Sequence, residues 1–499
     1  MSRTYSDAIA SLNSLQSNFA VVDAIRKSGR SMNEQAIPEM IEWCRKIGYQ
    51  PSDFDRLNAI HIAGTKGKGS TSAFISSILT KFLNTKDEQD GRALSKVGLY
   101  TSPHLRFVRE RIQINGQPLS EEQFAKYFFE TWDRLERAAT DKGEDPKAPG
   151  AKPVYFRFLT LMAFHTYISE GVNATVIECG IGGAYDSTNV LQQPAVTGIT
   201  NLGIDHVGVL GGTLPEIAWH KAGVIKKGAK CYTTSSQLPE AEAVLEKVAS
   251  EVGSELVYVD VDPRMASGEI QLGLEAEFQK TNASLALAIA KDWLSNHGYA
   301  GLPSYEEKLA QGLRDCKWSG RCETRIEKNL TWYIDGGHTL ESIKLAGQWY
   351  ASTQGQQSTS TGPKSGKRYL IFNQQTRDAQ ALARALHDTL STTLNDAHPF
   401  SHAIFCTNTT FKEAGFKPDL VSVNTNASDV EALKVQKELA ETWKDIDVQS
   451  HVSVVRTIEE AVELVRQHAK EEEPVTAFVT GSLHLVGGFL EVVESGMSG

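Results

Sequence analysis

Residues 57–71 read LNAIHIAGTKGKGST. An apolar run of strand length, Leu57–Ala63, is followed by a glycine-rich turn and then by a run of helical pattern, Ser70–Phe82. In such a turn the glycines let backbone N–H groups approach a phosphate closely, Lys68 neutralises its charge, and the dipole at the helix N-terminus favours an anion. The stretch therefore predicts a phosphate-binding loop between a strand and a helix.

The spacing of this loop departs from the common GxxxxGK[ST] pattern, because Gly64 lies three residues, rather than five, before Gly67. A glycine-rich turn with an exposed lysine is the alternative reading. The strand before the turn and the helix after it favour nucleotide binding. The residues that we expect to contact a nucleotide here are Gly64, Thr65, Lys66, Gly67, Lys68, Gly69, Ser70 and Thr71.

The chain has 499 residues and a formal net charge of −10. Single domains usually stop growing near roughly 250–300 residues, so we expect more than one domain. The excess of acidic residues disfavours a protein that coats nucleic acid or anionic membrane. The sequence has no apolar stretch of about 18 residues, the length that a membrane-spanning helix needs, so no membrane span is expected. The six cysteines form no CxxC pair, which is typical of a reduced, intracellular protein rather than a zinc or disulfide scaffold.

Apolar runs of strand length alternate with longer helical patterns along the chain, which is typical of βαβ units and of a parallel sheet covered by helices. The pattern begins again after Trp318–Arg325. We therefore predict an α/β protein with two domains. An N-terminal P-loop-type parallel-sheet domain is expected over 1–317, a hinge over 318–330, and a smaller, Rossmann-like C-terminal domain over 331–499.

Two stretches with few apolar residues predict solvent-exposed loops. The first, Asp141–Lys152 (DKGEDPKAPGAK), joins two helical patterns. The second, Ser352–Arg368 (STQGQQSTSTGPKSGKR), is low in complexity and is expected to lie outside the packed core.

Two side chains that could bind a metal ion follow predicted strands. Glu178 ends the apolar run TVIE, so its carboxylate is expected at the carboxyl edge of the sheet, beside the phosphate loop. Mg²⁺ that accompanies a nucleoside triphosphate requires such hard oxygen ligands, although a solvated strand-end carboxylate is the alternative. His206 follows the strand Val196–Asn201 and could reach the same edge, but a lone histidine is more often a surface or core-edge residue.

Further motifs follow the phosphate loop in a fixed order, over roughly residues 60–340. They are Thr101–Leu105 (TSPHL), Glu178–Gly183 (ECGIGG), Asp186–Asn189 (DSTN), Thr200–His206 (TNLGIDH), Ile217–Gly223 (IAWHKAG), Trp318–Arg321 (WSGR) and Asp335–Thr339 (DGGHT). This set resembles the Mur-ligase superfamily and, within it, the folylpolyglutamate synthases. The last 150 residues or so match less, mainly through Thr480–Leu483 (TGSL).

The resemblance implies a set of magnesium ligands. Ser102, Glu178 and His206 would hold two Mg²⁺ ions, and Lys221 would supply a ligand to the second ion if its amine is carbamylated. A Ser-Pro turn without a ligand and a helix-surface lysine are the alternatives for Ser102 and Lys221. A monovalent cation is a further ligand that the resemblance allows.

The resemblance also assigns roles to residues of the second domain. Arg321 would reach the phosphates of ATP, and Asp335 the ribose or the hinge side. Domain closure would bring Arg321 to the charge that develops on the phosphates and exclude water. Without the resemblance, an arginine that follows Gly320 would be interpreted as a surface turn residue. His338 would face the incoming amino acid. The expected catalytic residues are Lys68, Arg321 and His338.

The substrate contacts that the resemblance implies lie on three loops. The residues expected to contact the substrates are Thr101, Pro103, His104, His338 and Ser482. For Ser482, a Gly-Ser turn between a strand and a loop, without a ligand, is an equal alternative.

By this resemblance the protein is expected to be an ATP-dependent ligase that adds L-glutamate to the γ-carboxylate of a reduced folate, with release of ADP and phosphate. The folate carboxylate would attack the γ-phosphorus to give an acyl phosphate, and the glutamate amine would then displace phosphate. Two alternatives stay open. A dihydrofolate synthase has the same site parts but accepts dihydropteroate, and a P-loop nucleotide-switch protein has no need for Arg321, Asp335 and His338 in a second domain.

The expected partners are small molecules, namely reduced folates, L-glutamate and ATP, and not nucleic acid. The resemblance implies a monomer in the cytoplasm, with a mitochondrial form if an alternative start adds an import segment. Residues 1–30 carry arginines and serines, but Asp7 and Asp23 interrupt them, which disfavours a mitochondrial presequence within the chain itself.

Overall fold

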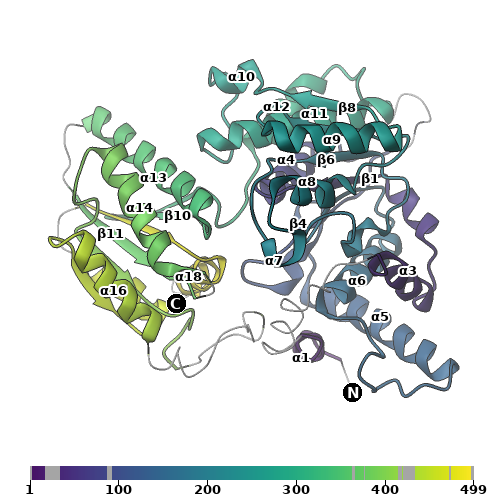
Figure 1. The fold of residues 1–499 in the computed structure, drawn as a ribbon, viewed down its shortest axis with the longest axis horizontal. Coiled ribbons are helices and arrows are strands. Elements are labelled where there is room, and N and C mark those ends of the chain that lie inside the picture. The colour runs from purple at the N-terminus through teal and green to yellow at the C-terminus, as the bar shows by residue number, and fades with distance from the viewer. Residues whose placement is uncertain are drawn as a thin grey trace. The chain divides into compact units, whose positions relative to one another are not determined.

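The computed structural model describes residues 3–16, 34–86, 91, 93–361, 366–375, 377–413, 419, 433–470 and 474–495. The chain forms two compact units, each built from a sheet covered by helices (Figure 1). The first unit comprises Met1–His104 and Val108–Lys317, and the second comprises Leu105–Phe107 and Trp318–Gly499. This architecture confirms the predicted α/β fold class. Within the described residues, no helix is both long enough and apolar enough to cross a membrane.

The first unit contains an eight-stranded sheet. Its strands are β1 (Ala59–Ala63), β2 (Val97–Tyr100), β3 (Ile112–Ile114), β4 (Gln117–Pro118), β5 (Ala174–Glu178), β6 (Val196–Ile199), β7 (Lys230–Thr234) and β8 (Leu256–Val259). They lie in the order β4-β3-β2-β5-β1-β6-β7-β8. All neighbours pair in parallel except β3, which is antiparallel to both β2 and β4. Every residue of β1 and β5 is buried, as expected for parallel strands with both faces covered.

Helices pack on this sheet or on one another. They are α1 (Tyr5–Asn13), α3 (Ala36–Lys46), α4 (Lys68–Thr80), α5 (Glu121–Asp141), α6 (Tyr155–Ser169), α7 (Val207–Leu210), α8 (Leu214–Ala222), α9 (Pro239–Val252), α10 (Pro263–Ala266), α11 (Glu277–Asn296) and α12 (Tyr305–Arg314), with 3-10 turns η1 (Pro51–Leu57), η2 (Val108–Arg111) and η3 (Ser187–Val190). The longest helix of this unit, α5, shows how the local sequence sets its start and its buried face. For example, α5 begins with a capping box between Ser120 and Gln123 and buries Phe124, Phe128 and Leu135 along one face.

The strand, turn and helix predicted around the phosphate loop are present as β1 and α4. The helix begins at Lys68, two residues earlier than the sequence pattern suggests, because Gly67 serves as its N-cap. Helices α4 and α11 pack against each other, and α8 packs against α9 (Figure 1). The phosphate loop therefore lies at the carboxyl end of β1, in the middle of the first sheet.

The second unit contains a six-stranded sheet in the order β13-β12-β11-β14-β10-β9. Its strands are β9 (Glu323–Glu327), β10 (Leu330–Ile334), β11 (Lys367–Phe372), β12 (His402–Phe405), β13 (His451–Val454) and β14 (Val475–Thr480), and its helices are α13 (Leu340–Thr361), α14 (Ala379–Leu394), α16 (Lys434–Ile446), α17 (Ile458–His468) and α18 (Leu483–Ser495). Only β9, which falls within residues 318–330, runs antiparallel to its neighbour.

Helices cover both faces of the second sheet. Trp332 of β10 packs edge-on against Phe489 of α18, whereas the next residue, Tyr333, packs against Tyr350 of α13. Successive side chains of a strand point to opposite faces, so α18 and α13 cover opposite faces. The carboxyl ends of β10, β11 and β14 then lie at one edge of the sheet, where ligands bind in folds of this kind.

One predicted loop is wrong in part. The stretch Ser352–Arg368 was expected to be a solvent loop, but α13 continues through it to Thr361 and β11 begins at Lys367. Residues 362–365 lie outside the described part of the chain. The physical reason is cooperativity: once Ile343, Ala346 and Tyr350 anchor the first turns of α13 in the core, each further residue adds a backbone hydrogen bond at little cost.

Truncation of Trp332 tests the packing of the second unit. The side chain is fully buried, so Trp332→Ala should lower the free energy of unfolding by about 3–5 kcal/mol. The matched control is Ile326→Ala on the adjacent strand β9, whose side chain is 79% exposed and should matter by less than about 0.5 kcal/mol. Urea unfolding followed by circular dichroism measures both, and equal effects of the two substitutions would contradict the described packing.

Candidate active site

Two glycines shape the phosphate loop between β1 and α4. Gly67 and Gly64 have φ values of 91° and 147°, in the region that glycine alone adopts readily. A Cβ atom at Gly67 would lie 2.2 Å from Oδ1 of Asn282, and one at Gly64 would lie 1.8 Å from Oγ1 of Thr200. Both positions therefore require glycine on two grounds. The backbone they shape leads directly into the N-terminus of α4, as a phosphate site requires.

Three lysines of the first unit gather at this loop. Lys68 and Lys221 both donate from Nζ to the carbonyl oxygen of Gly64, at 3.0 and 2.8 Å. Lys66 forms an ion pair with Asp205 at 2.8 Å. Burial, with the positive charge of Lys68 as a second cause, lowers the pKa of Lys221 to about 7. Near neutral pH the Lys221 amine is therefore partly uncharged, unlike an ordinary lysine.

Glu178 and Ser102 lie together at the carboxyl ends of β5 and β2, which are paired strands. The Glu178 side chain is 3% exposed, and its Oε2 accepts a hydrogen bond from the backbone N–H of Ser102 at 3.1 Å. A carboxylate and a hydroxyl are hard oxygen donors of the kind that Mg²⁺ prefers. These two residues fit the predicted ion.

The surroundings of His206 differ from those of the buried Glu178. It is exposed, adopts a left-handed backbone conformation as the N-cap of α7, and donates its backbone N–H to Oδ1 of Asp205 at 2.9 Å. Asp205 in turn pairs with Lys66, so His206 adjoins the phosphate loop through its neighbour. Among the residues that the structure describes, no group of three or more histidine, cysteine, aspartate or glutamate side chains could hold a metal ion.

The loop that follows Glu178 is held by a buried carboxylate. Asp186 accepts hydrogen bonds from the backbone N–H groups of Gly180 and Ile181, each at 3.0 Å, and from both the N–H and the hydroxyl of Thr188. Burial raises the pKa of Asp186, while these hydrogen bonds act in the opposite direction. The DSTN motif thus fixes the backbone next to the candidate metal ligand.

The predicted substrate residues of the first unit follow β2. The backbone N–H of Thr101 donates to the carbonyl of Arg111 at 3.1 Å, and the Ser102–Pro103 peptide bond is cis. Nδ1 of His104 accepts a hydrogen bond from Nε of Arg111 at 3.0 Å. In a neutral ring the proton therefore resides on Nε2 of His104, which becomes a donor.

In the second unit, Asp335 directly follows strand β10 and is almost fully buried. Its two carboxylate oxygens accept hydrogen bonds from the backbone N–H groups of Cys322 at 3.0 Å and Gly337 at 2.8 Å. Burial raises the pKa of Asp335, and the charge of Arg321 acts in the opposite direction. Asp335 thereby joins the turn that carries Arg321 to the loop that carries His338.

His338 and Ser482 follow neighbouring strands of the second sheet. Nδ1 of His338 lies 2.8 Å from the carbonyl oxygen of Gly336. A carbonyl can only accept, so Nδ1 carries the proton and Nε2 of a neutral ring is an acceptor. The Ser482 hydroxyl accepts from the backbone N–H of His484 at 3.2 Å, and Gly481 N–H donates to the carbonyl of Gly337 at 3.1 Å.

Several polar residues around these groups carry no local sequence signal. In the first unit, Gln279 of α11 donates to the Ser70 hydroxyl at 3.1 Å, and Asn282 donates to Gln279 at 2.9 Å. In the second unit, Gln374 donates to the carbonyl of Gly481 at 2.9 Å. These residues contact the candidate site only because distant segments fold together, so spacing along the chain could not reveal them.

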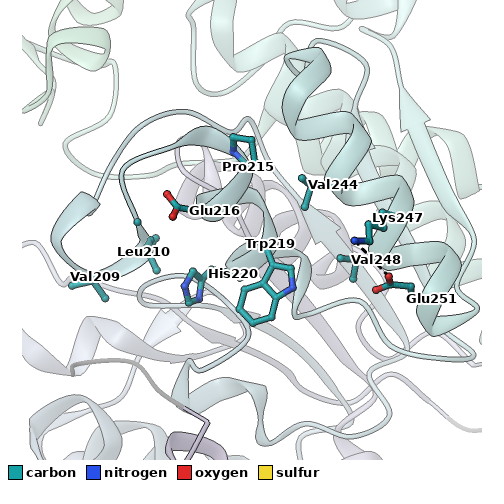
Figure 2. A pocket seen from close by; sticks show the side chains of 11 residues that line it. Val209, Leu210, Pro215, Glu216, Trp219, His220, Val244, Lys247, Val248 and Glu251 are labelled. Carbon is teal, nitrogen blue, oxygen red and sulfur yellow. Dashed lines mark ion pairs between the residues drawn. The ribbon is translucent and has the colours of Figure 1, made fainter. Parts of the chain in front are cut away.

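A hollow of about 490 Å³ lies on the first unit beside α7, α8 and α9 (Figure 2). Trp219 of α8 lines it, whereas Lys221 of the same helix donates to the phosphate loop. Residues two positions apart on an α-helix point roughly 200° apart. The hollow therefore lies on a different side of α8 from the phosphate loop and is no part of the nucleotide site.

The comparison with solved structures defines the class of fold. A structure from Mycobacterium tuberculosis, described as folylpolyglutamate synthase complexed with ADP, covers 97% of this chain and 99% of its own, with a TM-score of 0.68 and 22% identity. At that identity the likeness shows the fold, which is the two-domain Mur-ligase-like fold. Models of known protein families give no match.

Curated relatives define the particular family. A folylpolyglutamate synthase of Saccharomyces cerevisiae (strain AWRI796) is 46% identical over 503 residues, which cover 99% of this chain and 87% of that protein. A folylpolyglutamate synthase of Neurospora crassa is 45% identical over 99% of this chain and 92% of its own. The chain belongs to the folylpolyglutamate synthase family, which confirms the resemblance that its motifs indicate.

Alanine substitutions at two glycines separate backbone strain from a steric clash. Gly228 has a φ of 85° with no atom within 4 Å of an added Cβ, so Gly228→Ala should cost about 1 kcal/mol of stability and leave nucleotide affinity unchanged. Gly67→Ala adds the clash with Asn282, so the loop must shift and nucleotide affinity should fall about tenfold or more. Calorimetric titration with ATP measures both, and wild-type affinity in Gly67→Ala would refute the loop geometry.

Proposed function

We propose that this protein is an ATP-dependent ligase that adds L-glutamate to the γ-carboxylate of a (poly)glutamylated tetrahydrofolate, releasing ADP and phosphate. The supporting observation is the phosphate loop, with Lys68 and Lys221 on one carbonyl oxygen, in a chain 45–46% identical to proteins named folylpolyglutamate synthase.

The first unit would bind Mg-ATP. The residues from Gly64 to Thr71 would cradle the phosphates with the N-terminus of α4, and Lys68 would neutralise their charge. Ser102, Glu178 and His206 are the proposed ligands of two Mg²⁺ ions, with Lys221 as a further ligand if carbamylated. When bound, Mg²⁺ supplies charge neutralisation on the phosphate oxygens. A monovalent cation is also proposed.

The folate carboxylate would attack the γ-phosphorus of ATP, so that ADP leaves and an acyl phosphate forms. The amine of L-glutamate would then attack the acyl carbon, and phosphate would leave as the amide bond forms. No covalent bond to the protein is needed. The protein therefore contributes by positioning the reactants and stabilising charge, as enzymes that catalyse phosphoryl transfer usually do.

Residues of the second unit have defined parts in this scheme. Arg321 would stabilise the developing charge on the phosphates, while Asp335 holds the turn of Arg321 and the loop of His338 through backbone hydrogen bonds. Because Nδ1 of His338 donates to a carbonyl, Nε2 is the atom suited to accept a proton from the incoming amine. Ser482 would offer its hydroxyl to a substrate carboxylate, and Thr101, Pro103 and His104 would contact the folate.

Two other functions are less well supported. A dihydrofolate synthase would use the same groups on dihydropteroate, but the similar relatives carry the name folylpolyglutamate synthase. A P-loop nucleotide switch would have no use for Arg321, Asp335 and His338. We further propose a monomer in the cytoplasm, with a mitochondrial form where an alternative start adds an import segment.

The reaction is tested by ADP release from Mg-ATP in the presence and absence of tetrahydrofolate and L-glutamate, with product mass read in parallel. We expect release to require both co-substrates and the product to grow by successive glutamyl units. Lys68→Ala should reduce turnover by about 10³-fold or more, whereas Lys247→Ala, on the exposed face of α9, should have no effect. Release driven by dihydropteroate instead, or release indifferent to both co-substrates, would replace the proposal with one of the two alternatives.

Carbamylation of Lys221 has a distinct pH signature. Only the neutral amine attacks CO₂, and because the pKa of Lys221 is lowered to about 7, the neutral fraction grows as pH rises through 7 and is lost below it. With ¹³C-bicarbonate, NMR should therefore show a carbamate carbon at pH 8 that disappears toward pH 6. Lys221→Met should remove the signal, whereas Lys226→Met, at a half-buried lysine nearby, should keep it. A signal that survives in Lys221→Met would place the modification elsewhere.

A further inference from the structure

A buried histidine lies in the middle of the first sheet, and no step of the proposed reaction uses it. His61 is the central residue of β1, whose other residues are all alanine or isoleucine. Its side chain is fully buried. Burial, with the positive charge of Lys226 as a second cause, lowers the pKa of the ring to about 3, so the ring is neutral near pH 7. A neutral imidazole still carries one donor and one acceptor, which are costly to bury without partners.

The ring of His61 contacts a hydroxyl that binds a buried carboxylate. Nε2 of His61 lies 2.8 Å from Oγ1 of Thr188, and Oγ1 lies 2.6 Å from Oδ1 of Asp186. Asp186 also accepts hydrogen bonds from three backbone N–H groups, as an ionised carboxylate does. The Thr188 hydroxyl therefore gives its single proton to Asp186, and its oxygen is left to accept from His61.

The two ring nitrogens agree with this direction. Nδ1 of His61 is buried without a hydrogen-bond partner in the part of the chain that the structure describes. A proton on Nδ1 would leave a buried donor unsatisfied, whereas a proton on Nε2 reaches Oγ1 of Thr188 and, at 3.1 Å, Sγ of Cys179. The proton therefore lies on Nε2. In this tautomer the nitrogen that faces Thr188 cannot accept its hydroxyl proton, which is thereby directed to Asp186.

Backbone pairing fixes Glu178 but not the loop that follows it. Strands β1 and β5 pair in register up to Ile62 and Glu178. After Glu178 the chain leaves the sheet, and the N–H groups of Gly180 and Ile181 donate to Oδ2 of Asp186 instead. The orientation of the Asp186 carboxylate therefore sets the backbone that leaves Glu178.

The turn that contains Thr188 also holds the end of α8. Thr188 lies in η3, and its neighbour Asn189 donates from Nδ2 to the carbonyl oxygen of Gly223 at 3.1 Å. Gly223 is the C-cap of α8 and lies two residues after Lys221. One turn thus contacts both the loop after Glu178 and the helix that carries Lys221, and all of these residues belong to the first unit.

We propose that His61 is a positioning residue: by donating to the Thr188 hydroxyl it directs that group to Asp186 and keeps the carboxylate in one orientation. The turn built on these contacts then holds the candidate magnesium ligands Glu178 and Lys221. Which ion the two ligands bind rests on the proposed function. Residues that orient metal ligands from behind commonly tune the metal affinity of a site. His61 itself touches no reacting atom.

The substitution Thr188→Val tests the hydroxyl, because valine has nearly the shape of threonine but no hydrogen-bonding group. We expect the dissociation constant for ATP, measured by calorimetric titration in Mg²⁺, to rise about tenfold, as is usual when a residue that orients metal ligands is lost. With EDTA in place of Mg²⁺ the constant should equal that of the wild type, since a bare phosphate is not attracted to a carboxylate such as Glu178. Thr188→Ser keeps the hydroxyl and should bind Mg-ATP as the wild type does.

Two substitutions of His61 separate its donor from its size. Glutamine and methionine have side chains of similar length, but only glutamine carries an N–H donor. His61→Met should weaken Mg-ATP binding in the same direction as Thr188→Val, and His61→Gln should recover part of the loss. The double variant His61→Met with Thr188→Val should be little worse than Thr188→Val alone, because the two residues act through one contact.

The matched control is Thr131→Val on α5. Thr131 is as fully buried as Thr188, and its hydroxyl donates to the carbonyl oxygen of Tyr127 at 2.8 Å within the same helix. This substitution should lower the melting temperature but leave the affinity for ATP unchanged, with or without Mg²⁺. The proposal would be overturned by an equal loss of affinity in Thr131→Val, by a loss in Thr188→Val that is the same in Mg²⁺ and in EDTA, or by no loss at all in Thr188→Val.

If Thr188→Val does not fold, the wild-type protein carries the test. With ¹⁵N-labelled histidine, NMR near pH 7 should show the ring of His61, assigned through its proximity to Thr188, neutral and with its proton on Nε2. A proton on Nδ1 would overturn the proposal. Failure of the proposed function is distinguishable, because the wild-type protein itself would then bind ATP equally well in Mg²⁺ and in EDTA.

Discussion

The carbonyl oxygen of Gly64 accepts hydrogen bonds from two lysines, and the first unit is organised around this contact. Like charges repel, and the site is buried, so the convergence of Lys68 and Lys221 is costly in the absence of an anion or of proton loss. The lowered pKa of Lys221 is one expression of that cost. A phosphate group relieves it on the Lys68 side, and a neutral Lys221 relieves it on the other. The central position of β1 and the start of α4 at Lys68 hold both amines in place.

Each unit uses a buried aspartate to fix the backbone beside its site. Asp186 accepts hydrogen bonds from the backbone N–H groups of Gly180 and Ile181, in the loop after Glu178. Asp335 accepts hydrogen bonds from the backbone N–H groups of Cys322, which follows Arg321, and Gly337, which precedes His338. Burial raises the pKa of both carboxyls, so each depends on its hydrogen bonds to remain ionised. Loops held in this way can present side chains to a ligand with little loss of conformational freedom.

The motifs predicted the fold class and the family because they combine local geometry with a fixed order along the chain. Gly64 and Gly67 needed no tertiary context to indicate a phosphate loop. The predicted loop at Ser352–Arg368 failed in part, because composition describes what a segment exposes and not how far a packed helix propagates. The side chains Asn282 and Gln279 escaped prediction, since their contacts with the phosphate loop join segments about 200 residues apart.

By itself, the sequence determined what depends on consecutive residues: the strand, turn and helix at 59–80, the carboxylate at the end of β5, and the division into two α/β patterns. These follow from backbone propensity, apolar spacing and glycine, all of which act locally. Only the tertiary structure decided that Lys221 meets Lys68 on one carbonyl and that His61 meets the hydroxyl of Thr188. Both outcomes depend on burial and charge between residues more than 100 positions apart, which no local pattern encodes.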